Sequence, residues 1–281
     1  MLKQRILTAL VLLLILLPAM FYRDPWPFCA ISLVMIAAGA WEWAKLNGYR
    51  AFTSLSVGLA CAGLCTALWL LGALVQPTPE LWRGAGAVWV LVGAWVLRGG
   101  VAAWSVHRPS LRLAGGLVAL CLAWLAVAQA KVIGINFLLS ILLLVWVADI
   151  AAYFAGRSLG GKFIHQKLAP GISPGKSWEG VIGGMLGVLV LAFMWRWADA
   201  AWAVQPSSLY SQLGQKGGWF LLIAMVFMTA MSVVGDLFES LVKRSAGVKD
   251  SSGLLPGHGG VLDRIDALLP TLPLAMMLYS V

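Results

Sequence analysis

The sequence predicts an all-α polytopic membrane protein that crosses the bilayer about nine times. Hydrophobic residues make up 61% of the 281 residues and the mean hydropathy is +0.89, whereas soluble proteins contain roughly 45–50% apolar residues. Charged residues make up only 11%. The apolar residues gather in runs close to the ~20 residues that a helix needs to span the hydrocarbon core. These three observations exclude a soluble globular domain.

Nine apolar runs follow one another along the chain, at 6–22, 27–44, 52–75, 84–97, 113–130, 135–156, 180–197, 218–242 and 261–280. The first run follows Lys3 and Arg5, as in a signal peptide. No small-x-small cleavage site follows it, so we expect a retained span. The fourth run is the least regular, because Gly99 and Gly100 allow it either to end near 97 or to continue toward Trp104.

The positive charges give these runs an orientation. If the N-terminus and the connections after the second, fourth, sixth and eighth runs share one side, fourteen Lys and Arg residues lie on that side and five on the other, with Arg264 at the mouth of the last run. Lys and Arg accumulate on the cytoplasmic side of membrane proteins. We therefore expect a cytoplasmic N-terminus and a C-terminus outside.

The net charge and the cysteines limit the kinds of partner and cofactor that the chain can bind. The net charge is +9, but no basic tail or polar domain carries it, so we exclude nucleic acid and assign the charge to orientation and to contact with membrane lipid headgroups. The four cysteines lie inside apolar runs and form no CxxC pair; they are Cys29, Cys61, Cys65 and Cys121. We interpret them as small buried hydrophobes, with no disulfide framework or metal site.

Charge is concentrated near the C-terminus. One helix face at the end of a long apolar run carries four polar residues at i, i+3, i+4 and i+7; they are Asp236, Glu239, Ser240 and Lys243. Asp263 and Asp266 share a face at the start of the next run, and the loop between is rich in glycine. Carboxylates beside Lys and Arg in this arrangement suit divalent metal ions that hold phosphates.

A second polar segment lies at 149–180. Asp149, Tyr153 and Arg157 recur every four residues and form one polar stripe at the end of the sixth apolar run. The following loop reaches the sequence Ser-Pro-Gly-Lys-Ser-Trp-Glu-Gly at 173–180. An ionisable residue inside a membrane span indicates a functional site, because its burial without a partner is costly.

Both segments resemble one known family. The C-terminal segment is similar to the signature of the phosphatidate cytidylyltransferases (CDP-diacylglycerol synthases) at Ser240, Lys243, Arg244, Lys249, Asp250, Pro256, His258, Gly259, Gly260, Asp263, Arg264 and Asp266. Residues 173–180 resemble the family's second motif, Ser-Pro-x-Lys-Ser/Thr-x-Glu-Gly. The two motifs occur in the order that the family has them.

The resemblance implies an activity and a division of the chain. A phosphate oxygen of phosphatidate attacks the α-phosphorus of CTP, giving CDP-diacylglycerol and pyrophosphate. We expect a scaffold of five helices at 1–134 and a catalytic region at 135–281, whose cytoplasmic loops are 157–179 and 243–260. We also expect the bacterial cytoplasmic (inner) membrane as the location, and a homodimer stays open.

Both substrates are highly anionic, so metal ions and cations should carry most of the catalysis. Asp236 and Asp263 are the predicted Mg²⁺ ligands, because both lie at span ends beside the glycine-rich loop. Asp266 and Asp149 are candidates for a second metal ion or for supporting the first. The alternative role of each carboxylate is a buried partner for Arg157, Lys243 or Arg264.

The predicted substrate contacts are mostly cationic. Lys243, Arg244, Lys249 and Arg264 are expected to hold the triphosphate or the lipid headgroup, and His258 to donate to the leaving pyrophosphate. Further candidates for substrate binding are Ser240, Arg157, Lys176, Ser177, Gly259 and Gly260. The alternative role of the basic residues is to extend to the phosphates of membrane lipids. The alternative for His258 is a solvated position in the loop. Glu42, the one acid near the end of the second run, is expected to pair with Lys45.

Other classes of membrane protein also remain as alternatives. A transporter or channel would also place acids inside the membrane, although the acids lie on one side and no internal repeat is visible. Two other enzyme families fit less well. The CDP-alcohol phosphotransferases use a denser Asp motif, and the polyprenol kinases share CTP but not the loop at 243–266.

Overall fold

The computed structural model describes residues 2–281, which form eleven helices and one two-stranded sheet. The elements in order are α1 (Leu2–Phe21), α2 (Trp26–Leu46), α3 (Ala51–Leu70), α4 (Pro79–Val106), α5 (Pro109–Ile133), α6 (Ile135–Leu159), β1 (Lys167–Ala169), β2 (Ser173–Ser177), α7 (Trp178–Ala201), α8 (Leu209–Gln215), α9 (Gly218–Ser245), α10 (Leu262–Ile265) and α11 (Leu268–Ser280). The expected all-α class is confirmed, with one small hairpin added.

Eight of these helices, α1 to α7 and α9, are long and apolar enough to cross a membrane within residues 2–281. The chain is therefore a polytopic membrane protein, and eight of the nine predicted runs are single long helices. The fourth run continues to Val106, as one of the two alternatives proposed, although Gly100 interrupts it with a φ of 70°. A positive φ is readily accessible only to glycine.

The ninth run differs from its prediction. Residues 261–280 form two helices, and α11 has 13 residues, so at 1.5 Å per residue it covers only ~20 Å of the ~30 Å hydrocarbon core. Pro270 lies in the first turn of α11, where its missing N–H is tolerated, and Pro273 lies inside the helix. Pro270 has no N–H to donate to the Asp266 carbonyl oxygen one turn earlier, and this explains why α10 does not continue into α11.

Small residues bring α6 and α7 together. A Cβ added to Gly183 would lie 2.2 Å from the Cβ of Ala155, and one added to Gly187 would lie 2.6 Å from the Cβ of Ala151. Close approach through small side chains is the usual way in which helices pack in membranes. The α6–α7 pair forms one wall of the site described below.

The expected loop at 157–179 contains the antiparallel hairpin of β1 and β2. The Glu179 carboxylate at the start of α7 accepts hydrogen bonds from the backbone N–H groups of Gly161, Phe163 and Ile164. The Ser177 hydroxyl caps α7 by accepting from the Gly180 N–H at 3.2 Å. A loop of charged residues is thereby held in one place.

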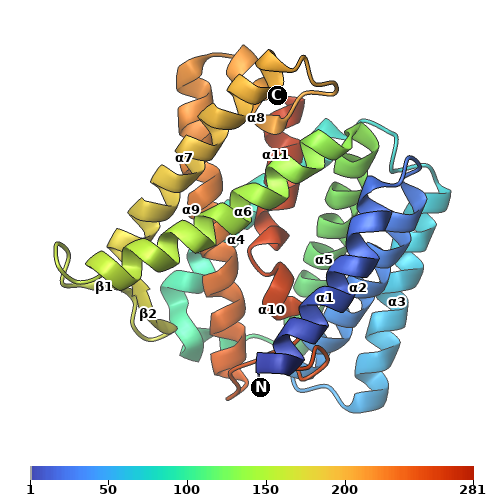
Figure 1. The fold of residues 1–281 in the computed structure, drawn as a ribbon. Coiled ribbons are helices and arrows are strands. Elements are labelled where there is room, and N and C mark those ends of the chain that lie inside the picture. The colour runs from blue at the N-terminus through green and yellow to red at the C-terminus, as the bar shows by residue number, and fades with distance from the viewer. Residues whose placement is uncertain (1) are drawn as a thin grey trace.

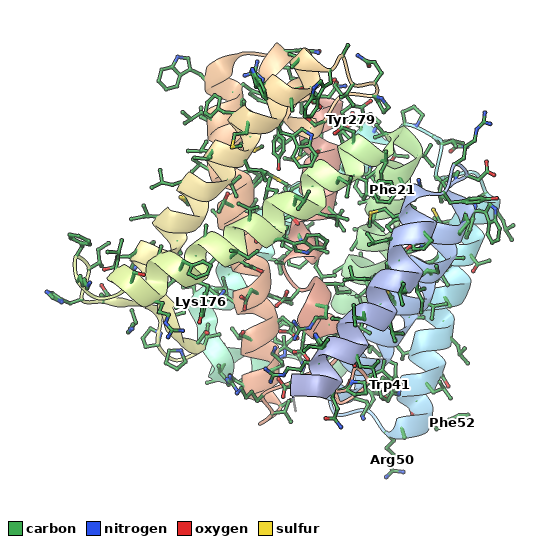
Figure 2. All side chains as sticks on the ribbon, in the orientation of Figure 1. Phe21, Trp41, Arg50, Phe52, Lys176 and Tyr279 are labelled. Carbon is green, nitrogen blue, oxygen red and sulfur yellow. The ribbon has the colours of Figure 1, made fainter. Side chains whose placement is uncertain are left out.

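The helices run between two opposite ends of the molecule. Figure 1 shows α7 and α9 on one side, α1 to α3 on the other, and α10 and α11 between them. Helix α11 is buried along most of its length and packs against α4, α5 and α9. Lys176 and Arg50 lie toward the end where α1 begins, whereas Phe21 and Tyr279 lie toward the other (Figure 2).

The predicted boundary at 134–135 falls at Gly134, between α5 and α6.

Candidate functional site

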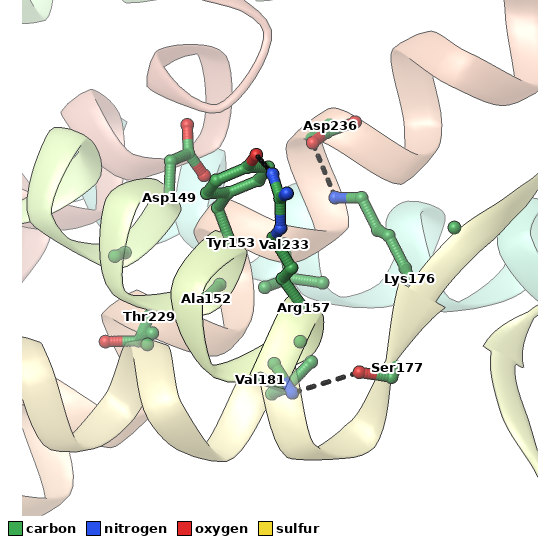
Figure 3. A pocket seen from close by; sticks show the side chains of 15 residues that line it. Asp149, Ala152, Tyr153, Arg157, Lys176, Ser177, Val181, Thr229, Val233 and Asp236 are labelled. Carbon is green, nitrogen blue, oxygen red and sulfur yellow. Dashed lines mark hydrogen bonds and ion pairs between the residues drawn. The ribbon is translucent and has the colours of Figure 1, made fainter. Parts of the chain in front are cut away.

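A cavity of about 410 Å³ opens between α6, β2, α7 and α9. Charged and polar side chains from three of these elements line it (Figure 3); they are Asp149, Tyr153, Arg157, Lys176, Ser177, Thr229 and Asp236. We call this the polar cavity. The two predicted segments, 149–180 and 236–266, therefore meet in space at this point.

An ion pair crosses the polar cavity. The Lys176 ammonium lies 2.5 Å from an Asp236 carboxylate oxygen, and the Ser240 hydroxyl donates to the other oxygen at 3.2 Å. The Lys176 and Asp236 side chains keep 24% and 30% exposure, so both remain accessible to a ligand. Their contact joins the second family motif to the C-terminal segment.

The stripe on α6 forms the opposite side of the polar cavity. The Arg157 guanidinium donates to the Tyr153 hydroxyl at 2.7 Å, and both side chains are exposed. Asp149 lies one turn further along the same helix face and is also exposed to the cavity. The four-residue spacing predicted this shared face, and the prediction is confirmed.

A second polar group, the α9–α10 cluster, consists of Glu239, Lys243, Ser251, Gly260 and Asp263. The Lys243 ammonium pairs with both carboxylates, and its distance to the Asp263 oxygen is 2.6 Å. The other Asp263 oxygen accepts from the Gly260 N–H at 2.7 Å and from the Ser251 N–H and hydroxyl at 2.9 Å. Burial alone would raise the pKa of Asp263, but the Lys243 ammonium and these hydrogen bonds outweigh it and lower the pKa to about 2.

The glycines of the loop leave room for this cluster. A Cβ at Gly259 would lie 2.6 Å from the Asp263 carboxylate, and one at Gly260 would lie 2.0 Å from the Ser251 hydroxyl. Any larger residue at either position would displace the carboxylate or the serine. The two predicted substrate-binding glycines thus contact Asp263 and its partners.

Asp266 connects the two polar groups. Its backbone oxygen would lie 2.6 Å from a Cβ at Gly235, next to Asp236. Burial, and then the negative charge of Asp236, raise the pKa of Asp266 to about 7. Asp149 adds a smaller effect in the same direction. Three carboxylates, from α6, from α9 and from the segment between α10 and α11, therefore lie near enough to repel one another.

Four predicted residues lie outside both groups in this structure. Arg244 and Lys249 are exposed, and Arg244 donates to the Val248 carbonyl oxygen at 3.1 Å. The Arg264 guanidinium donates to the His258 carbonyl oxygen at 2.6 Å. Among the described residues the His258 Nδ1 atom is buried and has no hydrogen-bond partner, whereas the alternative role was a solvated loop histidine.

Glu42 is a further functional candidate, for which the sequence analysis expected only a pairing with Lys45. It is fully buried on α2, and its carboxylate accepts from the Val261 and Leu262 N–H groups and from the hydroxyls of Ser251 and Ser252. The expected pairing with Lys45 is wrong, because the Lys45 ammonium lies 4.5 Å from the centre of the Trp41 ring. A lone acid inside an apolar helix was the available signal.

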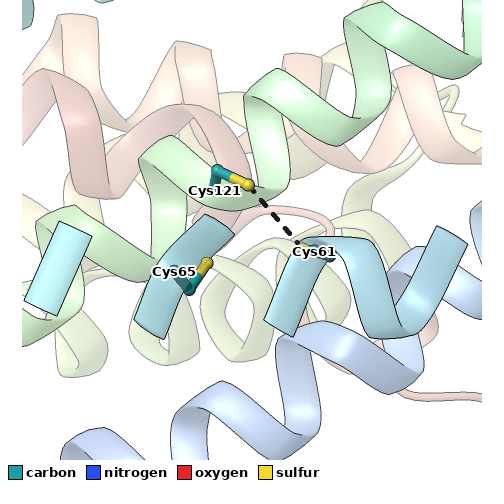
Figure 4. A group of neighbouring side chains, drawn as sticks. All are labelled: Cys61, Cys65 and Cys121. Atoms are coloured by element: carbon teal, nitrogen blue, oxygen red, sulfur yellow. Dashed lines mark hydrogen bonds between the residues drawn. The ribbon is translucent and has the colours of Figure 1, made fainter. Parts of the chain in front are cut away.

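The structure confirms the cysteines as free thiols that are buried or half-buried, and it adds that three of them lie together. The sulfurs of Cys61, Cys65 and Cys121 all lie within 4.8 Å of one another, between α3 and α5 (Figure 4). In the described residues this is the one group of three or more Cys, His, Asp or Glu side chains that meets this distance. All four cysteines carry free thiols. Spacing shows that Cys61 and Cys65 share a face, but Cys121 joins them only through tertiary packing.

Comparison with known proteins gives a consistent result over the whole chain. The sequence model described as "Cytidylyltransferase family" matches residues 3–281. The chain is 38% identical to a phosphatidate cytidylyltransferase of Pseudomonas aeruginosa, over 100% of this chain and 98% of that protein. It is 36% identical to one of Haemophilus influenzae over 99% of each chain. One of Thermotoga maritima is 42% identical over 48% of this chain and 46% of its own length.

Proposed function

Because this chain belongs to the cytidylyltransferase family, we propose that it transfers CMP from CTP to phosphatidate, forming CDP-diacylglycerol and pyrophosphate. The chain is a nucleotidyltransferase of phospholipid biosynthesis and an integral membrane protein. A phosphate oxygen of phosphatidate forms the new bond to the α-phosphorus of CTP, and the bond to the β-phosphate oxygen breaks. The earlier alternative of a transporter is set aside.

The polar cavity is the observation that carries this proposal. It joins the second family motif to the C-terminal segment through the contact of Lys176 with Asp236, and it holds two acids and two basic side chains beside apolar spans. The nucleophile is an ionised phosphate and needs no strong base, so charge neutralisation and alignment are the main demands. The residues of this cavity supply both.

We assign the phosphates to the basic residues of the cavity. Lys176 precedes Ser177, the N-cap of α7, where free N–H groups and the helix dipole favour anions. Arg157 is exposed on the facing wall and suits a phosphate bidentately. Lys243 is engaged by two carboxylates, so its proposed role is to hold the glycine-rich loop and Asp263 beside the cavity.

Four further candidates flank the glycine-rich loop, and we keep them as mobile contacts to substrate. Arg244 and Lys249 are exposed, and the side chain of Arg264 is also exposed. His258 presents a buried Nδ1 without a partner. Each of the four lies outside the polar cavity, so their proposed roles require the loop at 243–260, and α10 with Arg264, to approach bound substrate.

Mg²⁺ is the proposed cofactor, and the available ligands suit it. Asp149, Asp236 and Asp266 offer carboxylate oxygens, which hard cations prefer, and their mutual repulsion would be relieved by a cation. Asp263 stays a predicted ligand, but its oxygens already accept four hydrogen bonds. When bound, one or two ions would neutralise the charge of the transferring phosphates.

The membrane orientation is also a proposal. The end at which α1 begins carries Lys176 and Arg50 (Figure 2), and this supports a cytoplasmic N-terminus and an active site that faces the nucleotide. Similarity to bacterial proteins supports the bacterial inner membrane. The predicted homodimer stays a prediction, which the mass of the purified protein in detergent would test.

The test uses purified protein in detergent with phosphatidate, Mg²⁺ and CTP labelled on its α-phosphate. We expect label in a lipid that co-migrates with CDP-diacylglycerol, and one pyrophosphate released for each lipid formed. Omitting phosphatidate or adding EDTA should abolish both products. Folded protein that labels no lipid across a range of phosphatidate chain lengths and divalent metals would contradict the proposal.

A further inference from the structure

A second cavity, of about 440 Å³, lies between α4, α5 and α9. Its wall is formed almost entirely by apolar and aromatic side chains, and it includes Trp43, Trp89, Trp104 and Phe238. We call it the apolar cavity. Its volume lies within the ~300–1,000 Å³ of typical ligand sites.

The apolar cavity is separate from the polar cavity. Phe238 lines it, whereas Asp236, two residues earlier on α9, lines the polar cavity. Residues two apart on a helix point to opposite sides. The Phe238 ring also packs between Trp89 and Trp104, with ring centres 5.7 Å and 5.5 Å away. The aromatic side chains thus close the cavity on the side of the catalytic residues.

The other side of the apolar cavity faces outward from the bundle. Val88, Trp95 and Val118 line the cavity and are 58%, 58% and 59% exposed. They belong to α4 and α5, which are both long enough to cross the membrane. A chain of the surrounding bilayer can therefore enter the cavity between these two helices.

One end of the apolar cavity carries unpaired donors. Within residues 2–281, the Arg112 Nε and the Trp104 Nε1 atoms are buried and have no hydrogen-bond partner, and Trp104 is only 6% exposed. Buried N–H groups are nearly always paired, because leaving one unpaired is costly. The Arg112 guanidinium also lies 5.9 Å from the centre of the Trp104 ring, and His107 lines the same end.

We propose that the apolar cavity binds one acyl chain of an anionic bilayer phospholipid, whose phosphate is held by Arg112 with Trp104 and His107 beside it. No acid occurs among the described residues that line the cavity, so the charge at its polar end is positive. Guanidinium groups bind phosphate bidentately, and basic pockets between membrane helices are typical sites for anionic lipid headgroups. This lipid is a resident partner and is distinct from the substrate.

The test measures lipid binding directly, with the full chain in detergent and a phosphatidylglycerol that carries a photoactivatable group in one acyl chain. We expect the label on α4 and α5, at residues around Val92 and Gly115 that line the cavity. Neither CTP nor activity is needed, so the outcome is independent of the proposed reaction. Label spread evenly over all apolar helices would overturn the proposal.

Matched variants test the two parts of the site. A Cβ at Gly115, in the apolar cavity, and one at Gly63, on α3, both meet nothing within 4 Å. Gly115→Leu should therefore block labelling of α4 and α5, whereas Gly63→Leu should leave it unchanged. Equal labelling of the two variants would overturn acyl-chain binding in this cavity.

The headgroup is tested in the same way. Arg112→Gln should reduce labelling about tenfold at a fixed low probe concentration, since a charge-assisted bond to phosphate contributes on this scale. Arg108→Gln, at an exposed arginine outside the cavity, should not. Unlabelled phosphatidylglycerol should compete better than phosphatidylcholine with the same chains. Equal competition would contradict the anionic headgroup, and it can be measured on the unmodified protein if a variant fails to fold.

Discussion

The buried carboxylate of Glu42 ties the glycine-rich loop to α2, and its removal should weaken the whole site. Its two oxygens accept from the Val261 and Leu262 N–H groups at 3.0 and 2.8 Å and from two serine hydroxyls. Asp263 follows directly in the sequence. The loop that positions Asp263 therefore depends on a residue more than 200 positions earlier in the chain.

The loss in the free energy of unfolding that Glu42→Gln causes can be estimated from these contacts. Glu42→Gln keeps one acceptor oxygen, so the N–H of either Val261 or Leu262 loses its partner. A buried unpaired donor costs ~1–3 kcal/mol. The hydrogen bonds that remain now go to a neutral amide oxygen, so the contribution of each to stability falls from ~1.5–3 to ~0.5–1.5 kcal/mol. Together these changes predict a loss of ~2–4 kcal/mol in the free energy of unfolding.

The assay compares Glu42→Gln with Glu80→Gln, in denaturant unfolding of purified protein and in transfer of CMP to phosphatidate. Glu80 makes an exposed ion pair with Arg83, and exposed pairs contribute only ~0–1 kcal/mol. We expect Glu42→Gln to unfold earlier and to lose most of its transfer activity, and Glu80→Gln to resemble the wild type. Equal stability of the two variants would refute the assigned role of Glu42.

Three further predictions concern the packing around the site. Ser177→Ala removes the N-cap of α7 and should lower the free energy of unfolding by ~1 kcal/mol, measured in denaturant. Gly183→Leu forces α7 away from α6 and should cost ~1–3 kcal/mol in the same measurement, whereas Gly84→Leu, whose added Cβ meets nothing within 4 Å, should not. Asp266 has a pKa of about 7 in the folded protein and ~3.9 when unfolded, so its stabilising protonation is lost as the pH rises toward 7. The free energy of unfolding should therefore fall between pH ~4 and ~7, and Asp266→Asn should reduce this fall in metal-free buffer; an unchanged slope would contradict the assigned burial.

Hydropathy predicted the spans because each depends only on its own residues. It placed α1 to α7 and α9, but it left open whether α4 ends near residue 97 or continues toward Trp104. It read 261–280 as one span, because averaged hydropathy does not register that Pro270 and Pro273 each remove a backbone N–H. The hairpin in 157–179 was missed because Glu179, rather than an alternating apolar pattern, holds that loop.

Helical spacing predicted the parts of the site that lie on one helix. It correctly placed Asp149 with Arg157 on one face, and Asp236 with Ser240 on another. It could not predict that Lys176 contacts Asp236, or that Glu42 accepts from the Leu262 N–H, since both contacts join distant segments. Such contacts follow from the packing of β2 against α9 and of α10 against α2, and they leave no periodic signal.

The central claim is that the polar cavity is where CMP transfer occurs, and one comparison tests it most directly. Initial rates of phosphatidate-dependent transfer are measured for wild type, Asp236→Asn, Lys176→Met and Asp24→Asn, the last at an exposed aspartate outside both cavities. The account predicts that the first two variants stay folded and lose ~10²-fold or more in kcat, as when a transition-state contact is removed, while Asp24→Asn retains the wild-type rate. Folded Asp236→Asn and Lys176→Met proteins with the wild-type rate would contradict it.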